Sequence, residues 1–494
     1  MTPPPPRVRL LPSLLAFAPA AALLICYVVL YLGFAGRLIA TPFGLDQGEG
    51  YDAWSAMILA GGRWPYTNND AAPYFSSNYP PVWSVLVAAV MLVTGPGLAP
   101  ARFVATLATL ITAALLGGAA YRRARALADL RFGLVAAGGA AGFFLASPYV
   151  FHTTPLARVN SLALMFAVLT LTLFERPTRV RIVAGSLVLV AALFTKQTTL
   201  DAAAAAIGFA FLAQPRRGAA AAAIVGVLGA VLLVALVAAT QGAFWLNVVA
   251  ANNNPFELEQ LGMYLANFGI VHALLLLLAG AEWRDAIRER EWSPWMLYFP
   301  IALVTALTVG KWGAGESYFL GAIAVTCVLA ATRLVRLLQG TRAERRIVAV
   351  ALTVQLLVLA HGPLTSIPGL ADHGPQAMFL GKAHTAAEVA ELRKLVDLAA
   401  SVSGPVLSEE PSIVIAAGKP VIANATQLRN LHDQGRWDSS QLVSDIEARR
   451  FGLVILTAQL YPAPVLDAIG QHYTTDDTMK VGSTAYQVMV PRPR

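Results

Sequence analysis

Long apolar runs recur between residues 14 and 361, and they constrain the fold of this chain more than any other feature. Most are roughly 17–25 residues long, the length that an α-helix needs to cross the hydrocarbon core of a bilayer. Only 13% of the 494 residues are charged, which is too few to cover the surface of a soluble protein of this size. The pattern therefore predicts an α-helical polytopic membrane protein.

We expect about eleven transmembrane helices in this part of the chain. They lie near residues 14–38, 102–121, 132–151, 160–174, 182–196, 198–214, 219–240, 265–281, 294–310, 317–332 and 347–361. A further apolar run at 80–94 ends in a segment rich in Gly and Pro. We interpret this run as juxtamembrane or re-entrant, because a full span there would invert every later loop.

Arginine clusters between the expected spans predict which loops face the cytoplasm, because short cytoplasmic loops are enriched in Lys and Arg. The clusters comprise Arg7 and Arg9; Arg122, Arg123, Arg125 and Arg131; Arg176, Arg179 and Arg181; Arg216 and Arg217; Arg284, Arg288 and Arg290; and Arg333, Arg336, Arg342, Arg345 and Arg346. Each neighbouring pair of clusters is bridged by one out-and-back hairpin. We therefore expect a multi-pass protein of a bacterial plasma membrane, with a cytoplasmic N-terminus and an extracytoplasmic C-terminus.

The net charge of +8 is unevenly distributed. Residues 385–494 contain 10 Lys and Arg against 12 Asp and Glu, whereas the rest of the chain contains 26 against 16. The basic excess thus lies in short loops between spans, where it indicates topology and not a nucleic-acid partner. Cys26 and Cys327 both lie in apolar runs, which predicts neither a disulfide framework nor a cysteine metal site.

The composition changes after residue 361. We expect a linker at 362–384 and then an extracytoplasmic α/β domain at 385–494, which is large enough to fold alone. Within this domain the periodicity predicts helices at 385–402 and 440–450, strands at 405–408, 420–424 and 451–457, and a β-hairpin at 473–489. The fold prediction is therefore a transmembrane domain at 1–361 followed by this small domain, which either docks and guides an acceptor or is purely structural.

Residues 41–81, within an expected first outer loop at 36–101, form the most unusual polar segment. Three carboxylates, Asp46, Glu49 and Asp52, lie within seven residues directly after the first span. A carboxylate close to hydrocarbon is expensive unless it has a function or a partner. Asp46 and Glu49 share one face if a helix begins here, which suits a base that removes a hydroxyl proton. Alternatively they cap the helix or pair locally, for example with Arg63, and Asp52 is expected to be structural.

Three cations lie at the expected outer boundaries of other spans. Arg158 and Lys196 can each bind a phosphate or extend towards the membrane interface. Lys311 repeats this pattern, and Glu316 near it either belongs to the same site or forms a salt bridge with it. His152 alone is weak support for a metal ligand. Cations that converge on carboxylates at one membrane face suit an anionic leaving group and a deprotonated nucleophile.

At these residues the chain resembles the GT-C superfamily of polyprenyl-phosphate-sugar-dependent glycosyltransferases. It is most similar to bacterial members related to protein O-mannosyltransferases and lipid A aminoarabinose transferases. The matching segments are DQGEGYDAWSAMILAGG, NYPPVWSVLVAAV, LARVNSLALMFAVL, ALFTKQTTL, GKWGAGESYFL and GRWDSSQLVSDIEARRFGLVIL, which follow one another over most of the chain.

The resemblance implies that Asp46 is the catalytic base, with Glu49 as the second catalytic candidate, and that the first outer loop contains juxtamembrane helices. The candidates for substrate binding are Arg158, Lys196, Lys311, Glu316 and Tyr318. Members of the superfamily often have an acid where this chain has Asn160, so a metal bound through that position is in doubt. No cofactor is certain; a divalent cation held by Asp46, Glu49 and the phosphate is an alternative, and no metal ligand set is assigned.

The expected reaction is inverting transfer of a hexosyl or pentosyl group from undecaprenyl or decaprenyl phosphate to a glycan, lipid or protein of the cell envelope. The rival interpretation is a transporter or flippase of a lipid-linked sugar, and a third is an oligosaccharide ligase that uses a lipid diphosphate. Transporters often contain internal repeats and helices broken at mid-membrane. No repeat is apparent here, and the polar residues gather at one face, which favours the enzyme.

Overall fold

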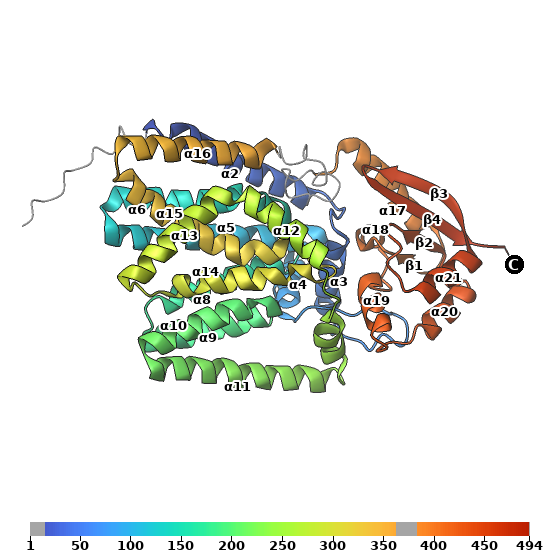
Figure 1. The fold of residues 1–494 in the computed structure, drawn as a ribbon. Coiled ribbons are helices and arrows are strands. Elements are labelled where there is room, and N and C mark those ends of the chain that lie inside the picture. Colours follow the sequence, from blue (N-terminus) through green and yellow to red (C-terminus); the bar gives the residue numbers. More distant parts are fainter. Residues whose placement is uncertain (1–14, 362–382, 494) are drawn as a thin grey trace, which may run out of the picture.

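The computed structural model describes residues 15–361 and 383–493, and it contains a helical bundle beside a smaller mixed domain (Figure 1). Four helices are long and apolar enough to cross a membrane. They are α2 (Ala18–Ala40), α5 (Leu98–Leu127), α11 (Pro215–Ala239) and the continuous segment of η5 (Glu316–Phe319) and α15 (Leu320–Leu338). These helices are those of a multi-pass membrane protein, as the apolar runs predict.

The other helices of the bundle are shorter or less apolar. They are α6 (Leu130–Ala146), α7 (Pro148–Thr153), α8 (Asn160–Phe174), α9 (Arg179–Leu193), α10 (Leu200–Ala213), α12 (Leu258–Val271), α13 (Ala273–Glu289), α14 (Pro294–Ala306) and α16 (Arg342–His361). Every expected span therefore coincides with a helix or a pair of helices. Because the described residues contain only four clear spans, or five with a bent pair, eleven remains a prediction.

Helix α15 forms the centre of the bundle. It packs against α5, α6, α13 and α14, and most of its side chains are buried. Its sequence LGAIAVTCVLAATRLVRLL is rich in small residues, which let neighbouring helices approach closely in a membrane protein. Helix α11, by contrast, is largely exposed along the edge of the bundle (Figure 1). Its Leu and Val side chains suit contact with lipid.

The span expected at 265–281 is not straight, because α12 and α13 meet at an angle of 82°. The break lies at His272, whose Nε2 is 2.8 Å from the Ser147 hydroxyl. Gln355 of α16 accepts a hydrogen bond from the Leu274 amide at 3.0 Å and donates one to the Val271 carbonyl at 2.6 Å. A broken helix is tolerated among apolar helices when neighbouring side chains satisfy the freed backbone groups in this way.

Two short helices follow the first span at the end of the bundle, and α3 is the one that borders the smaller domain (Figure 1). Helix α3 spans Gln47–Ala60 and α4 spans Val82–Thr94. Asp46 caps α3, because its extended backbone lets the side chain accept a hydrogen bond from the Gly48 amide at 2.9 Å. Helix α4 is apolar but has only 13 residues, so its juxtamembrane or re-entrant placement stays a prediction.

The smaller domain is built on a four-stranded sheet with the order β1-β2-β4-β3. Its elements are α17 (Ala386–Ser401), β1 (Val406–Ser408), α18 (Pro411–Ala416), α19 (Ala425–Asp433), α20 (Ser440–Glu447), β2 (Leu453–Leu456), α21 (Ala463–His472), β3 (Tyr473–Val481) and β4 (Thr484–Pro491). Strands β1 and β2 are parallel, and the other neighbours are antiparallel. The expected sheet domain is confirmed, whereas the linker expected at 362–384 lies almost entirely outside the described residues.

The strand expected at 420–424 is wrong. This segment has no strand partner in the sheet, and its Ala423 forms only an isolated bridge with Tyr74 of the first outer loop. The Tyr74 hydroxyl also donates to Asp445 at 2.7 Å, and Trp437 donates to the Asn69 carbonyl at 2.7 Å. The apolar, extended segment 420–424 therefore contacts the first outer loop and does not form a strand of the sheet.

Asn247 extends this docking contact to the bundle. It lies in the short π-helix η2 (Trp245–Val249) and is fully buried. Its amide nitrogen donates to the Thr67 carbonyl at 2.7 Å. Its oxygen accepts from Asn69 at 2.8 Å and from Gln427 of the smaller domain at 2.6 Å. One buried side chain of the bundle thus contacts both the first outer loop and the smaller domain, which helps to fix that domain against the bundle.

We predict that the smaller domain is extracytoplasmic and that the Arg122–Arg131 cluster is cytoplasmic, because basic loops stay inside. The test uses single cysteines at two exposed positions, Lys394→Cys and Arg125→Cys, in a chain whose native Cys26 and Cys327 are replaced by alanine. A membrane-impermeant thiol reagent is expected to label position 394 in intact cells and position 125 only after permeabilisation. Labelling of position 125 in intact cells would contradict the topology.

Candidate functional site

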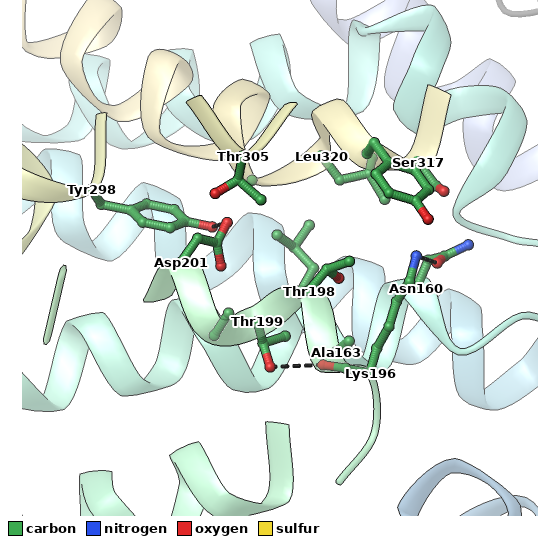
Figure 2. A pocket seen from close by; sticks show the side chains of 14 residues that line it. Asn160, Ala163, Lys196, Thr198, Thr199, Asp201, Tyr298, Thr305, Ser317 and Leu320 are labelled. Atoms are coloured by element: carbon green, nitrogen blue, oxygen red, sulfur yellow. Dashed lines mark hydrogen bonds between the residues drawn. The ribbon is translucent and has the colours of Figure 1, made fainter. Parts of the chain in front are cut away.

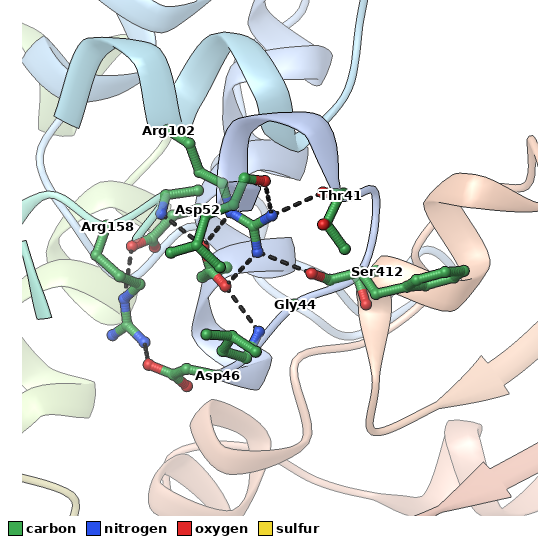
Figure 3. Close-up of polar contacts among 12 residues, drawn as sticks. Thr41, Gly44, Asp46, Asp52, Arg102, Arg158 and Ser412 are labelled. Atoms are coloured by element: carbon green, nitrogen blue, oxygen red, sulfur yellow. Dashed lines mark hydrogen bonds and ion pairs between the residues drawn. The ribbon is translucent and has the colours of Figure 1, made fainter. Parts of the chain in front are cut away.

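Asp46 and Arg158 meet at the end of the bundle that faces the smaller domain (Figure 3). An Arg158 Nη1–Asp46 Oδ2 hydrogen bond of 2.5 Å joins them, and the Asp46 side chain remains 41% exposed. Arg158 Nε lies 3.0 Å from Asp52 Oδ2, in an ion contact that lacks hydrogen-bond geometry. The arginine therefore holds the carboxylate of Asp46 in place while leaving that carboxylate open on one side.

Gly48 makes this arrangement sterically possible. A side chain at position 48 would overlap the guanidinium of Arg158, because a Cβ there would lie 1.6 Å from its Nη1. Two residues later, a Cβ at Gly50 would lie 2.5 Å from Pro411 of the smaller domain. The glycines of the DQGEGY segment thus let Arg158 approach one side of α3 and the smaller domain approach another.

Asp52 is buried beneath this pair. Burial raises the pKa of its carboxyl group to about 7, and the nearby Arg158 guanidinium opposes that rise. This burial agrees with the structural role expected for Asp52, which stays a prediction. The sequence does not reveal this burial; the structure shows that Asp52 lies on the buried side of α3, whereas Asp46 caps the helix and stays partly exposed.

Glu49 is placed differently from Asp46. It forms a bidentate ion pair with Arg102 of α5 at 2.7 Å, and both side chains are 0% exposed. The remaining acceptor positions of Glu49 are taken by the backbone amides of Leu45 at 2.8 Å and Ala157 at 2.7 Å. Its geometry favours a structural role over the catalytic one expected from the sequence, and the partner is Arg102, not Arg63.

Arg102 completes the network with its other donors. It donates to the carbonyls of Leu38 at 2.6 Å, Thr41 at 2.7 Å and Phe43 at 2.8 Å. All five N–H groups of a guanidinium are thereby used. The pair ties the end of α2 to α3, to α5 and to the segment before Arg158 (Figure 3).

The divalent cation considered with Asp46 and Glu49 does not fit this arrangement, because both oxygens of Glu49 are occupied by hydrogen-bond donors. Across the part of the chain that the structure describes, no three His, Cys, Asp or Glu side chains gather in a potential metal site.

Lys196 lies within electrostatic range of Arg158 and is only 6% exposed. Its ammonium donates to Asn160 Oδ1 at 2.7 Å and lies 4.8 Å from the centre of the Tyr318 ring. Within the described ranges it forms no salt bridge, so neutral groups alone contact it directly. A buried cation with neutral neighbours is an open site for an anion.

The structure brings Asp46, Arg158, Lys196 and Tyr318 together but leaves two other candidates aside. Lys311 pairs through its backbone with Phe256, and its carbonyl accepts a hydrogen bond from Gln260 at 2.7 Å. Glu316 forms no salt bridge with Lys311 or with any other described cation. Both residues stay predictions for substrate binding, on a segment that neighbours the cluster.

A polar cavity opens beside Lys196 among α8, α10, α14 and α15 (Figure 2). It is lined by Asn160, Ala163, Leu164, Ala167, Lys196, Thr198, Thr199, Asp201, Tyr298, Thr305, Ser317, Tyr318, Leu320 and Gly321. Sequence reasoning missed Asp201 and Tyr298 here. A carboxylate in the otherwise apolar segment LDAAAAAIGFAF is the signal that would have identified the first of them.

The smaller domain contributes a carboxylate to the edge of the site. Glu410 Oε1 accepts hydrogen bonds from the Ser412 hydroxyl at 2.6 Å and from its amide at 3.2 Å. The pKa of Glu410 is raised to about 7, mainly by burial; the Ser412 hydrogen bonds oppose this rise, and the negative charges of Asp46 and Glu49 add to it.

With the geometry in place, comparison with solved structures identifies the architecture. The chain is similar to ArnT from Cupriavidus metallidurans bound to undecaprenyl phosphate, with a TM-score of 0.61, 14% sequence identity, and coverage of 95% of this chain and 99% of that one. The apo state of the same protein gives a TM-score of 0.59 at 14% identity with the same coverage. The chain has the GT-C fold. No protein-family profile and no curated protein sequence matches it.

We predict that Glu49→Ala destabilises the protein strongly, whereas Asp46→Asn does not. The first variant leaves the buried Arg102 charge without its partner, which typically costs about 3–5 kcal/mol. The second alters an exposed carboxylate and keeps its hydrogen-bonding shape. Thermal unfolding of the two variants in the same detergent is the measurement. Equal melting temperatures for Glu49→Ala and wild type would contradict a structural role for Glu49.

A second prediction concerns the pH dependence of the docked domain. The pKa of Glu410 is raised from its ordinary value of 4.5 to about 7, so the native state binds a proton that the unfolded state has released. Stability should therefore fall as pH rises from about 5 to about 7 and then level off. Glu410→Gln should remove this pH-dependent contribution to stability and raise the melting temperature at pH 8 by about 1 °C per kcal/mol gained. The exposed Glu391→Gln is the control, and an identical pH profile for Glu410→Gln and wild type would refute the assignment.

Proposed function

We propose that this protein is a membrane glycosyltransferase that transfers a sugar from a polyprenyl-phosphate donor to an acceptor of the cell envelope. The observation that carries the proposal is that Arg158 connects an open carboxylate, Asp46, with a buried lysine, Lys196. This arginine is bonded to the first and lies within electrostatic range of the second, which has only neutral direct contacts. A base and an anion site at one end of the bundle are what such a reaction needs. The fold supports the same class, because the similar ArnT structure contains undecaprenyl phosphate.

In the proposed reaction, Asp46 accepts the proton of an acceptor hydroxyl as that oxygen attacks the anomeric carbon of the sugar. The bond between this carbon and the phosphate oxygen breaks, and the lipid phosphate leaves with the electron pair. Lys196 stabilises the charge that develops on the leaving oxygen, which is where a preorganised cation contributes most. A single displacement of this kind inverts the anomeric centre.

Arg158 has a different role in this proposal from the phosphate binding first expected. Its Nη1 is engaged by Asp46, so it orients the base. Its Nε and Asp52 Oδ2 both lack a hydrogen-bond partner. They face each other at 3.0 Å in a buried ion contact, which holds Arg158 beside α3 while its Nη1 engages Asp46.

The smaller domain is proposed to position the acceptor. It packs on α3 through Pro411 and Ala425, and its Glu410 lies within electrostatic range of Asp46. An acceptor that reaches Asp46 is proposed to pass along this contact between α3 and the smaller domain. In this proposal the site faces the outside of the cell, as the arginine clusters predict.

We predict that Asp46→Asn lowers sugar transfer at least ~10²-fold while the protein remains folded, because the amide cannot accept the proton. The assay supplies purified protein with a panel of undecaprenyl-phosphate hexoses and pentoses, and with membrane extract as the source of acceptor. Release of undecaprenyl phosphate and sugar incorporation are measured together. Asp433→Asn, on the exposed end of α19, is the matched control.

Two outcomes of this assay would contradict the proposal. Near-normal turnover by Asp46→Asn would remove the base from this residue. If wild type moves intact lipid-linked sugar between leaflets and releases undecaprenyl phosphate from no donor, the protein is a transporter or flippase instead.

A further inference from the structure

The cavity beside Lys196 has two chemically different ends (Figure 2). At one end lie Lys196 and its partner Asn160, below Ser317. At the other end lie Asp201, Tyr298 and Thr305, which come from α10 and α14. One end is therefore cationic and the other carries a carboxylate with hydroxyl groups.

The carboxylate end is built with defined contacts. Asp201 Oδ2 accepts a hydrogen bond from the Tyr298 hydroxyl at 3.2 Å, and its Oδ1 accepts one from the Ala202 amide at 2.6 Å. Tyr298 is 1% exposed. In the described part of the chain no cation forms a salt bridge with Asp201. A carboxylate held this way among apolar helices is costly, so it marks a functional site by default.

Gly321 provides the space for this pair. A Cβ at position 321 would lie 2.4 Å from the Tyr298 hydroxyl oxygen and 3.2 Å from Asp201 Oδ2. The start of α15 therefore approaches the two polar side chains as closely as a residue without a side chain allows. An alanine here would displace the hydroxyl of Tyr298 or the carboxylate of Asp201.

The charges restrict what can occupy each end. A phosphate next to Asp201 would meet a like charge in a poorly solvated setting, so the phosphate belongs at Lys196. A lipid chain next to Asp201 would leave the carboxylate and the Tyr298 hydroxyl without polar partners, which is also unfavourable. A polyhydroxylated ring satisfies both conditions, because its hydroxyls donate to a carboxylate and exchange hydrogen bonds with Tyr298 and Thr305.

We propose that Asp201 and Tyr298 bind the glycosyl group of the donor and determine which sugar is accepted. This inference rests on the proposed function, since it takes Lys196 as the phosphate site. A glycosyl group is attached directly to its phosphate, so its binding site must adjoin the phosphate site, as the two ends of this cavity do. In the present arrangement the cavity has room for only a few water molecules. Binding of a sugar therefore requires this cavity to widen, and the proposal assigns that movement to Tyr318, which lines the cavity 4.8 Å from Lys196.

The test compares binding of two kinds of lipid to detergent-solubilised full-length protein. The probes are undecaprenyl phosphate alone and a panel of undecaprenyl-phosphate hexoses and pentoses. Asp201→Asn and Gly321→Ala are expected to weaken binding of the preferred glycosylated lipid at least tenfold and to leave undecaprenyl phosphate within twofold of wild type. Lys196→Ala is expected to weaken both lipids. Glu259→Gln, an exposed carboxylate on α12, is the control that should change neither.

Tyr298→Phe provides a second variant that keeps the ring and removes only the hydroxyl, in case Asp201→Asn or Gly321→Ala fails to fold. It should reorder the preference among sugars that differ in one hydroxyl group. If wild type binds no glycosylated lipid better than undecaprenyl phosphate, or if the variants weaken both lipids equally, the inference is wrong. Failure of the proposed function is distinct: wild type would then release undecaprenyl phosphate from no donor, whatever the variants bind.

Discussion

The buried ion pair between Glu49 and Arg102 is the interaction on which the site depends. Arg102 uses all its donors on Glu49 and on three carbonyls that follow or end the first span, and Glu49 also accepts from the backbone beside Arg158. A desolvated pair is stable only when its remaining hydrogen bonds are satisfied, and here they are. It therefore fixes α2, α3, α5 and the segment that carries Arg158 relative to one another.

Because the Glu49–Arg102 pair fixes these helices, the carboxylate of Asp46 can remain partly exposed. Asp46 begins α3, three residues before Glu49, so any shift of Glu49 would move the N-terminus of the helix and the carboxylate at its cap. Asp46 keeps one face exposed because Glu49 already supplies the buried contact that anchors α3. The two acids look equivalent in the sequence, yet one is used for packing and the other is left for chemistry.

This difference shows how far sequence reasoning reaches. Local patterns predict the apolar helices and the sheet domain, and they single out Asp46, Arg158 and Lys196 as charged residues next to apolar runs. Each of these predictions depends only on neighbouring residues in the chain. Local patterns do not predict that Glu49 pairs with Arg102, 53 residues away, or that Asp201 meets Tyr298, 97 residues away. Nor does periodicity reveal the bend at His272, which is possible because Gln355 of α16 satisfies the freed backbone groups.

The charged side chains at this end of the bundle fall into two groups: those that already have partners of opposite charge, and those that contact only neutral groups. Arg102 has its full set of acceptors and Arg158 has most of its contacts from two acids, so neither has much left to gain from a ligand. Lys196 and Asp201 have only neutral direct partners, and they lie at opposite ends of one cavity. Each remains buried at a cost that a ligand of the opposite polarity would offset. A molecule with an anionic group joined to a hydrogen-bond-donating ring complements both ends at once, and a sugar phosphate ester is such a molecule.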